Sequence, residues 1–163
     1  MPEIAYKCGT FALEQLARAR LGPRYNPRLL MHAASPKTGF TMASLVEGEA
    51  RTREARRHIA GILWHRVELG MPLQVDAVFP YILGKNTYEV TTEDLRVDSP
   101  YNTYRYTGLP PGPINNPSLD AITAALNPTP SNYLYYLSDK EGIMHYATTH
   151  EEHLINRAKY LGK

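Results

Sequence analysis

Apolar residues recur at helical spacing in the middle of the chain. One stripe with a period of 3.6 residues contains Ile59, Ile62, Leu63, Arg66 and Leu69. Gly70 follows the stripe, and a glycine at that point is typical of the left-handed residue that ends a helix. The pattern therefore predicts a helix over residues 53–69.

Capping residues, apolar spacing and proline or glycine stops divide the rest of the chain. They predict helices over residues 11–21, 29–34, from 38 or 41 to 49, 118–126, and 149–160. A short apolar piece over residues 75–83 ends at Gly84, and we expect Thr92 to cap a turn over residues 93–95. The chain is thus predicted to be largely helical.

Two segments near the C-terminal end have the aromatic and β-branched character of strands. Residues 133–137 and 144–147 are separated by a short polar segment containing Gly142, which predicts a hairpin. Residues 98–117 contain five prolines and are expected to be irregular. We therefore predict an α+β fold in which helices pack with a small antiparallel sheet.

The length of 163 residues suits one domain. We divide it into an N-terminal segment, residues 1–40, packed on the same domain, and a main segment, residues 41–163. Apolar residues make up 43% of the chain and charged residues 21%, which is an ordinary balance for a globular protein.

Charge and composition exclude several classes. The net charge of +2 is too small to indicate nucleic acid as a partner. The chain has one cysteine, so it can form no intramolecular disulfide, and it has no apolar run long enough to span a bilayer. We expect no membrane contact by this chain itself.

Tyrosine is abundant, with 12 residues against 3 Phe, and sugar sites use its flat ring and polar tip.

Two neighbouring carboxylates, Glu47 and Glu49, are the first candidates for chemistry. A glycosidase with two catalytic carboxylates needs both to face one substrate. Residues two apart on a helix point about 200° away from each other. If this segment is helical, only one of the two can act in the site.

Glu47 shares its predicted helix face with Phe40, Ala43 and Ala50. Apolar neighbours favour the neutral form of a carboxyl group, which suits a general acid. The alternative is an ordinary ion pair with Arg51, four residues on, at a solvated helix face.

Gln74 and Asp76 form a second candidate group. They alternate with apolar residues, so in extended backbone both side chains can point to one side. An amide and a carboxylate together can bind sugar hydroxyls. The alternative is a loop after a helix that satisfies its own hydrogen bonds.

A third group lies on the proline-rich segment. Prolines and glycines fix an irregular path that carries Ser99, Tyr101, Asn102, Thr103 and Tyr104. Such a loop presents donors, acceptors and ring faces in a preset arrangement, which lowers the ordering cost of binding. The alternative is a structural wrap across the core.

Three histidines, His145, His150 and His153, lie close together near the C-terminal end. The spacing of His150 and His153 does not match the helical zinc motif, in which the histidines are four residues apart. We predict no metal site and no cofactor.

The order of these segments resembles the YceG/MltG-like family of bacterial endolytic murein transglycosylases. The segments that carry the resemblance read ASLVEGEA, HRVELGMPLQVD, SPYNTY, GLPPGPI, AALNP and NYLYYL, followed by G-x-x-H-Y and T-x-x-EH, over residues 41–153. Departures include His65 where the family has Asn and Tyr146 where it has Phe.

The resemblance implies a lytic transglycosylase that cuts peptidoglycan strands internally, with residues 41–163 as its catalytic domain and a lysozyme-like active-site helix. The catalytic glutamate of the family maps onto Glu47, as general acid and then base, giving 1,6-anhydro-N-acetylmuramic acid ends. Gln74, Asp76, Asn102 and Tyr104 would line the glycan groove, with His145 near it.

The resemblance also implies partners and a location. The expected partners are peptidoglycan glycan strands and the cell-wall synthesis machinery, outside the cytoplasmic membrane and in a membrane-anchored parent protein. Alternatives are a muramidase-type hydrolase, in which water replaces the 6-hydroxyl, and a non-catalytic peptidoglycan-binding or scaffold module. An aromatic-rich nucleic-acid binder is the last alternative, and the acidic second half of the chain argues against it.

Overall fold

The computed structural model describes residues 36–162, as an α+β fold of five helices, two short 3-10 turns and one hairpin. The helices are α3 (Pro36–Glu49), α4 (Arg53–Glu68), α5 (Val78–Leu83), α6 (Leu119–Leu126) and α7 (His150–Leu161). The 3-10 turns are η2 (Thr87–Glu89) and η3 (Asp94–Arg96), and the strands are β1 (Tyr135–Ser138) and β2 (Met144–Ala147). The helices predicted over residues 11–21 and 29–34 lie outside the described residues.

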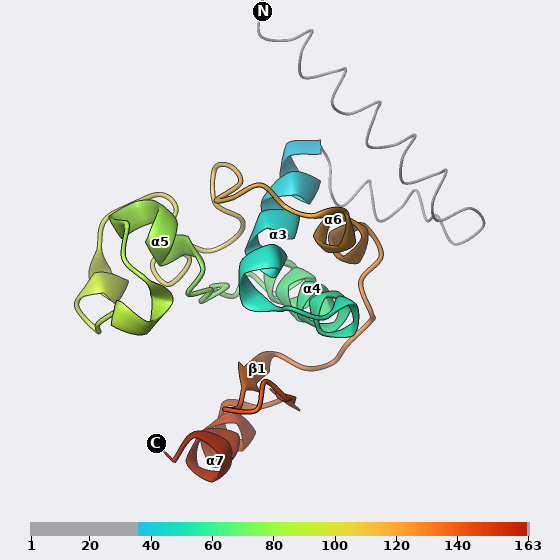
Figure 1. Ribbon diagram of the computed structural model, residues 1–163, viewed down its shortest axis with the longest axis vertical. Helices are drawn as coiled ribbons and strands as arrows, with labels where there is room; N and C mark the ends of the chain where they lie inside the picture. The colour runs from blue at the N-terminus through green and yellow to red at the C-terminus, as the bar shows by residue number, and fades with distance from the viewer. Residues whose placement is uncertain (1–35, 163) are drawn as a thin grey trace, which may run out of the picture.

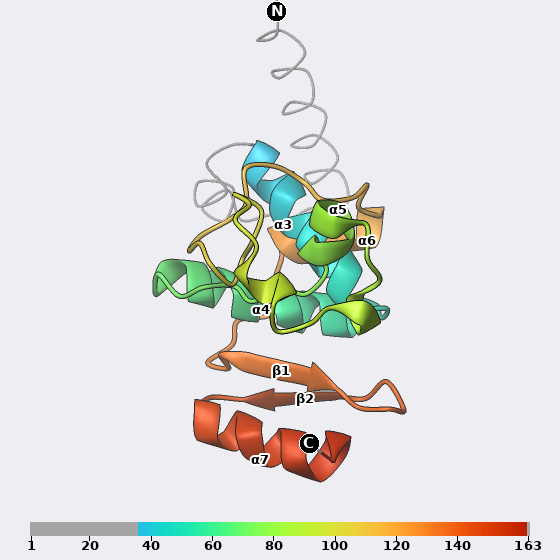
Figure 2. The same ribbon diagram turned by 90° about the vertical axis from the view of Figure 1, so that its left-hand side faces the viewer.

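Helices α3, α4 and α6 pack on one another and form the core (Figure 1). Fully buried apolar side chains from α3 and α4 meet there, among them Met42, Leu45, Ile59 and Leu63. The hairpin lies between α4 and α7, and α7 packs on both strands (Figure 2). The cavity described below therefore lies between a helical core and a smaller hairpin–helix unit.

Two glycines permit close backbone approach. A Cβ on Gly61 would lie 2.0 Å from the carbonyl oxygen of Thr129, so α4 runs directly against the segment after α6. A Cβ on Gly48 would lie 2.4 Å from that of Ala77, so the end of α3 touches the segment before α5. These contacts fix α3 and α4 against two connecting segments.

Most predicted elements are confirmed, with small shifts at their ends. The helix predicted over residues 53–69 ends at Glu68, and Gly70 has the left-handed φ of 66°. The hairpin pairs Tyr135 with Ala147. Ser118 caps α6, and Thr149 with Glu152 forms the capping box of α7.

The apolar piece over residues 75–83 does end at Gly84, and its last six residues form α5. Residues 73–75 run across the core beside Thr103, which bonds to the backbone of Gln74 and Val75. One local prediction is wrong. Thr91 and not Thr92 holds the turn that leads into η3, whose N-cap residue, Glu93, makes no side-chain cap bond. The Thr91 hydroxyl accepts from the Asp94 backbone N–H at 3.3 Å, while the Asp94 carboxylate accepts from Thr91 in return.

Candidate active site

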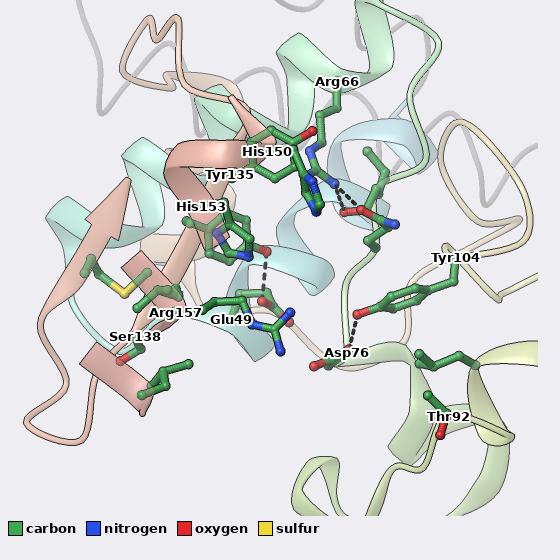
Figure 3. Close-up of a pocket in the computed structure, with 17 residues that line it drawn as sticks. Glu49, Arg66, Asp76, Thr92, Tyr104, Tyr135, Ser138, His150, His153 and Arg157 are labelled. Carbon is green, nitrogen blue, oxygen red and sulfur yellow. Dashed lines mark hydrogen bonds between the residues drawn. The ribbon is translucent and has the colours of Figure 1, made fainter. Parts of the chain in front are cut away.

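A cavity of about 680 Å³ lies where the end of α3, the segment after α4, the hairpin and α7 meet. Figure 3 shows that its polar side chains come from all of these elements. Those used below are Glu49, Arg66, Gln74, Asp76, Tyr104, Tyr135, Tyr136, His150, His153 and Arg157. Residues far apart in the chain thus converge on one space.

Glu49, the last residue of α3, is the half-buried carboxyl of the cavity. Its Oε2 accepts a hydrogen bond of 2.8 Å from the Tyr136 hydroxyl, and its Oε1 accepts one of 3.2 Å from the Ala77 backbone N–H. Burial raises the pKa of Glu49 to about 7, against these two hydrogen bonds, and the charge of Asp76 adds to the rise. At neutral pH this carboxyl therefore exists in both protonation states.

Asp76 and Tyr104 form a pair beside Glu49. The Tyr104 hydroxyl donates to Asp76 Oδ1 at 2.5 Å (Figure 3). Burial and then this hydrogen bond raise the pKa of Tyr104 far above its usual value, so the phenol stays neutral and keeps donating. Asp76 is consequently held in one position as a second carboxylate of the cavity.

Gln74 is the one non-glycine residue among residues 36–162 with a positive φ, 53°. Left-handed backbone at a non-glycine residue is strained and often occurs at functional sites. The Gln74 backbone N–H donates to the Thr103 carbonyl oxygen, and its side-chain oxygen accepts from Arg66 at 3.3 Å. This left-handed backbone places the side-chain amide of Gln74 on the cavity wall.

The buried side chain of Arg66 links the segments around the cavity by hydrogen bonds. It is 4% exposed, and its guanidinium donates to the carbonyl oxygens of Leu134, Pro72 and Leu73 as well as to Gln74. It therefore joins α4 to the segment that carries Gln74 and to the segment leading into β1.

Glu47 lies on another side of α3 and does not line the cavity. Its Oε1 forms an ion pair of 2.6 Å with Arg56, and its Oε2 accepts from the backbone N–H and the hydroxyl of Ser118 at 2.9 and 2.5 Å. Burial opposes the charge, but the hydrogen bonds from Ser118 and the charge of Arg56 outweigh it and lower the pKa of Glu47. The carboxylate stays charged and holds the first turn of α6 against α3.

Four of the predicted loop residues shape the cavity without lining it. Buried Asn102 donates to the carbonyl oxygens of Leu95 and Val97 at 3.0 and 2.9 Å. Thr103 bonds to both backbone groups of Val75. Ser99 accepts from the backbone of Tyr101, whose ring packs on Tyr81 with centroids 4.7 Å apart. Their contacts hold the loop that presents Tyr104.

His145, predicted near the groove, does not line the cavity. Its Nε2 lies 2.8 Å from an Asp139 carboxylate oxygen, and its ring stacks on Tyr160 with centroids 3.5 Å apart. These contacts tie the hairpin loop to α7. Within residues 36–162, no three His, Cys, Asp or Glu side chains are grouped to hold a metal ion.

The sequence profile of the YceG-like family matches residues 12–159. The chain belongs to this family. The matched range begins inside the segment of residues 1–40, ahead of the predicted catalytic domain.

Two relatives of this chain have the same name. A protein of Bacillus subtilis named endolytic murein transglycosylase is 39% identical over 137 residues, covering 84% of this chain and 38% of the relative. One of Streptococcus pneumoniae with the same name is 42% identical over 128 residues, covering 75% and 23%. The chain thus spans well under half the length of these relatives.

A crystal structure of a yceG-like protein from Listeria monocytogenes has the same fold, with a TM-score of 0.73 and 38% identity. The likeness covers 85% of this chain and 45% of that one. None of the helices described between residues 36 and 162 combines the length and apolarity needed to cross a membrane.

Sequence reasoning missed several cavity residues of this YceG-like chain. Glu49 was set aside because Glu47 was preferred, although helix geometry allowed either. Arg66 interrupts an apolar stripe, and an arginine there signals a buried functional or anchoring group. His150, His153 and Arg157 share one helix face, which their spacing in the predicted helix could have shown.

Proposed function

We propose that this chain is the catalytic domain of an endolytic murein transglycosylase and that Glu49, in place of Glu47, is its general acid and base. The observation that carries the proposal is the half-buried Glu49 carboxyl, whose pKa is raised to about 7, inside a polar cavity. A general acid works best with a pKa near the working pH. The names of the relatives supply the substrate class.

The proposed reaction uses one carboxyl twice. Protonated Glu49 gives its proton to the oxygen that links N-acetylmuramic acid to N-acetylglucosamine, and the bond from that oxygen to C1 of the muramoyl sugar breaks. The Glu49 carboxylate then takes the proton of the muramoyl 6-hydroxyl, whose oxygen bonds to C1. The products are a 1,6-anhydro end and a new hydroxyl, and no water is consumed.

The other cavity residues have supporting roles in this proposal. The Tyr136 hydroxyl orients Glu49 and stabilises its charged form after the first proton transfer. Gln74 and the Tyr104–Asp76 pair bind sugar hydroxyls. Ser99, Tyr101, Asn102, Thr103 and His145 act through the loops that they hold, rather than on the sugar.

Hydrolysis is the second candidate, and the position of Asp76 favours it. Asp76 is a second carboxylate in the cavity, and its charge is felt by Glu49. In that case Asp76 directs water to C1, which leaves a reducing end one water heavier than the anhydro end. Either reaction acts on the cell wall, so we place the protein outside the cytoplasmic membrane, working with the cell-wall synthesis machinery.

A digest of purified peptidoglycan, analysed by mass spectrometry, tests both assignments. We expect anhydro ends from the native chain and from Glu47→Gln, and none from Glu49→Gln. Reducing ends in place of anhydro ends would favour hydrolysis. Activity lost in a folded Glu47→Gln variant and kept in Glu49→Gln would restore Glu47 as the acid.

A further inference from the structure

One face of α7 lines the cavity and is basic. His150, His153 and Arg157 are spaced three and four residues apart, so they lie on one side of the helix, and all three line the cavity. Seven residues of helix rise about 10 Å. The basic face of α7, defined by these three residues, therefore extends along much of one cavity wall.

The Tyr135 ring lies among three basic side chains. The Arg66 guanidinium carbon lies 5.0 Å from the ring centroid, and the rings of His153 and His150 lie 5.4 and 5.8 Å from it. Figure 3 shows Tyr135 among Arg66, His150 and His153. The guanidinium is attracted to the ring face, and the two imidazoles pack on the same ring, so Tyr135 holds the three side chains together beside the cavity.

Within the part of the chain that the structure describes, none of these basic side chains forms an ion pair with a carboxylate. All acceptors of Arg66 are carbonyl or amide oxygens, and Arg157 forms no ion pair there. Burial lowers the pKa of His153, and the nearby charges of Arg157, His150 and Arg66 lower it further. Its Nδ1 is buried and, among residues 36–162, has no hydrogen-bond partner.

We propose, on the basis of the proposed function, that the basic face of α7 binds a carboxylate carried by the N-acetylmuramic acid residue of the strand. Glu49 and Asp76 on the same cavity repel an anion, whereas the α7 face attracts one, so the strand is bound in a single direction. The carboxylate belongs either to the peptide stem or to the lactyl group that is free where the stem has been removed.

Equilibrium binding in the Glu49→Gln background tests the subsite without cleavage. The ligands are glycan strands with peptide stems, strands stripped of peptide by an amidase, and chitin oligosaccharides of equal length, which carry no carboxylate. The test variant is Arg157→Gln. The matched control is Lys159→Gln, which removes the same charge from α7 at a residue that does not line the cavity.

We expect Arg157→Gln to weaken binding of the carboxylate-bearing strands by roughly three- to tenfold, as for a partly exposed charged contact. Chitin binding and the Lys159→Gln variant should be unchanged. A loss confined to peptide-bearing strands assigns the carboxylate to the stem. A loss confined to stripped strands assigns it to the lactyl group, which is an uncharged amide wherever the stem is attached, and a loss for both shows that the face accepts either carboxylate.

The subsite is overturned if Arg157→Gln changes nothing, if it weakens chitin binding equally, or if Lys159→Gln has the same effect. Cleavage by the native chain, measured separately, tells this failure apart from failure of the proposed function. If the native chain cuts strands but Arg157→Gln does not weaken binding, only the subsite proposal fails. A chain that neither cuts nor binds strands overturns both proposals.

Discussion

Glu47 and Glu49 are two carboxylates on the last turn of one helix, separated by one glycine, yet their surroundings shift their pKa values in opposite directions. Glu47 faces a cation and the first turn of α6, and its pKa is lowered. Glu49 faces the cavity and another carboxylate, and its pKa is raised to about 7. The comparison shows that position around a helix, rather than local sequence, decides the direction in which the surroundings shift the pKa of each carboxyl group.

The two pKa shifts differ because the two carboxylates have different hydrogen-bond and ion-pair partners. Glu47 receives two hydrogen bonds from Ser118 and an ion pair from Arg56, which together exceed the cost of partial burial. Glu49 receives one hydroxyl and one backbone N–H, which do not. No cation forms an ion pair with Glu49 within residues 36–162.

Exchanging each glutamate for glutamine separates the two roles most strongly. We expect Glu49→Gln to lower kcat/KM by about 10³-fold, as for loss of a general acid. Glu47→Gln should cost less than about tenfold, because the amide still fills its place beside Ser118. Rates of release of soluble fragments from peptidoglycan measure both. Equal losses in two folded variants would remove the distinction.

Stability should respond in the reverse order. Glu47→Gln loses the Arg56 pair and is expected to lower the free energy of unfolding by about 1–2 kcal/mol. Glu49→Gln removes a carboxylate that burial destabilises, so at pH 7 it should leave stability unchanged or raise it. Urea unfolding followed by circular dichroism checks this, with Lys159→Gln as the surface control.

The contributions of the two carboxyl groups to stability should depend on pH in opposite directions. With Glu49 as the proposed acid, kcat/KM should fall about tenfold per pH unit above about 7. Its raised pKa contributes stability that is full below about pH 4.5 and is lost as the pH rises through about 7. The lowered pKa of Glu47 contributes stability above about pH 4.5 that is lost on acidification. A rate profile unchanged between pH 6 and 9 would contradict the assignment.

The smallest expected effect is that of Tyr136→Phe. The variant removes the hydroxyl that stabilises charged Glu49, so the pKa of Glu49 should rise by less than about one unit. The alkaline limb of kcat/KM should move to higher pH by the same amount, while the limb of Tyr133→Phe, a nearby tyrosine outside the cavity lining, should stay in place. If the alkaline limb of Tyr136→Phe does not move, the Tyr136 hydroxyl does not influence the pKa of Glu49 and the residue contributes packing alone.

The elements of the fold could be read from the sequence where local signals decide them. Gly70, Ser118 and the Thr149–Glu152 capping box each mark a helix end correctly, because a cap involves neighbours within four residues. The left-handed backbone of Gln74 was not predicted, because this segment bonds to Thr103, nearly thirty residues away.

The candidate site was harder to predict for the same reason. Gln74, Asp76 and Tyr104 do meet in the cavity, and helix geometry did require a choice between the two glutamates. Deciding between them needed the positions of Arg56, Ser118 and Tyr136, of which the last two come from segments about seventy and ninety residues further along the chain. No spacing rule carries that information.

The hydrogen bonds of Arg66 bear on how this family can diverge. Three of its four acceptors are main-chain oxygens, which every amino acid supplies, so the side chains at positions 72 and 134 can change without removing these hydrogen bonds. Leu73 supplies a carbonyl oxygen in the same way, but its side chain is buried in the core and is constrained by packing. The arginine itself has no such freedom, because lysine lacks the planar fork that reaches several oxygens at once. Mutational libraries built around the cavity should therefore tolerate variety at positions 72 and 134 and almost none at position 66.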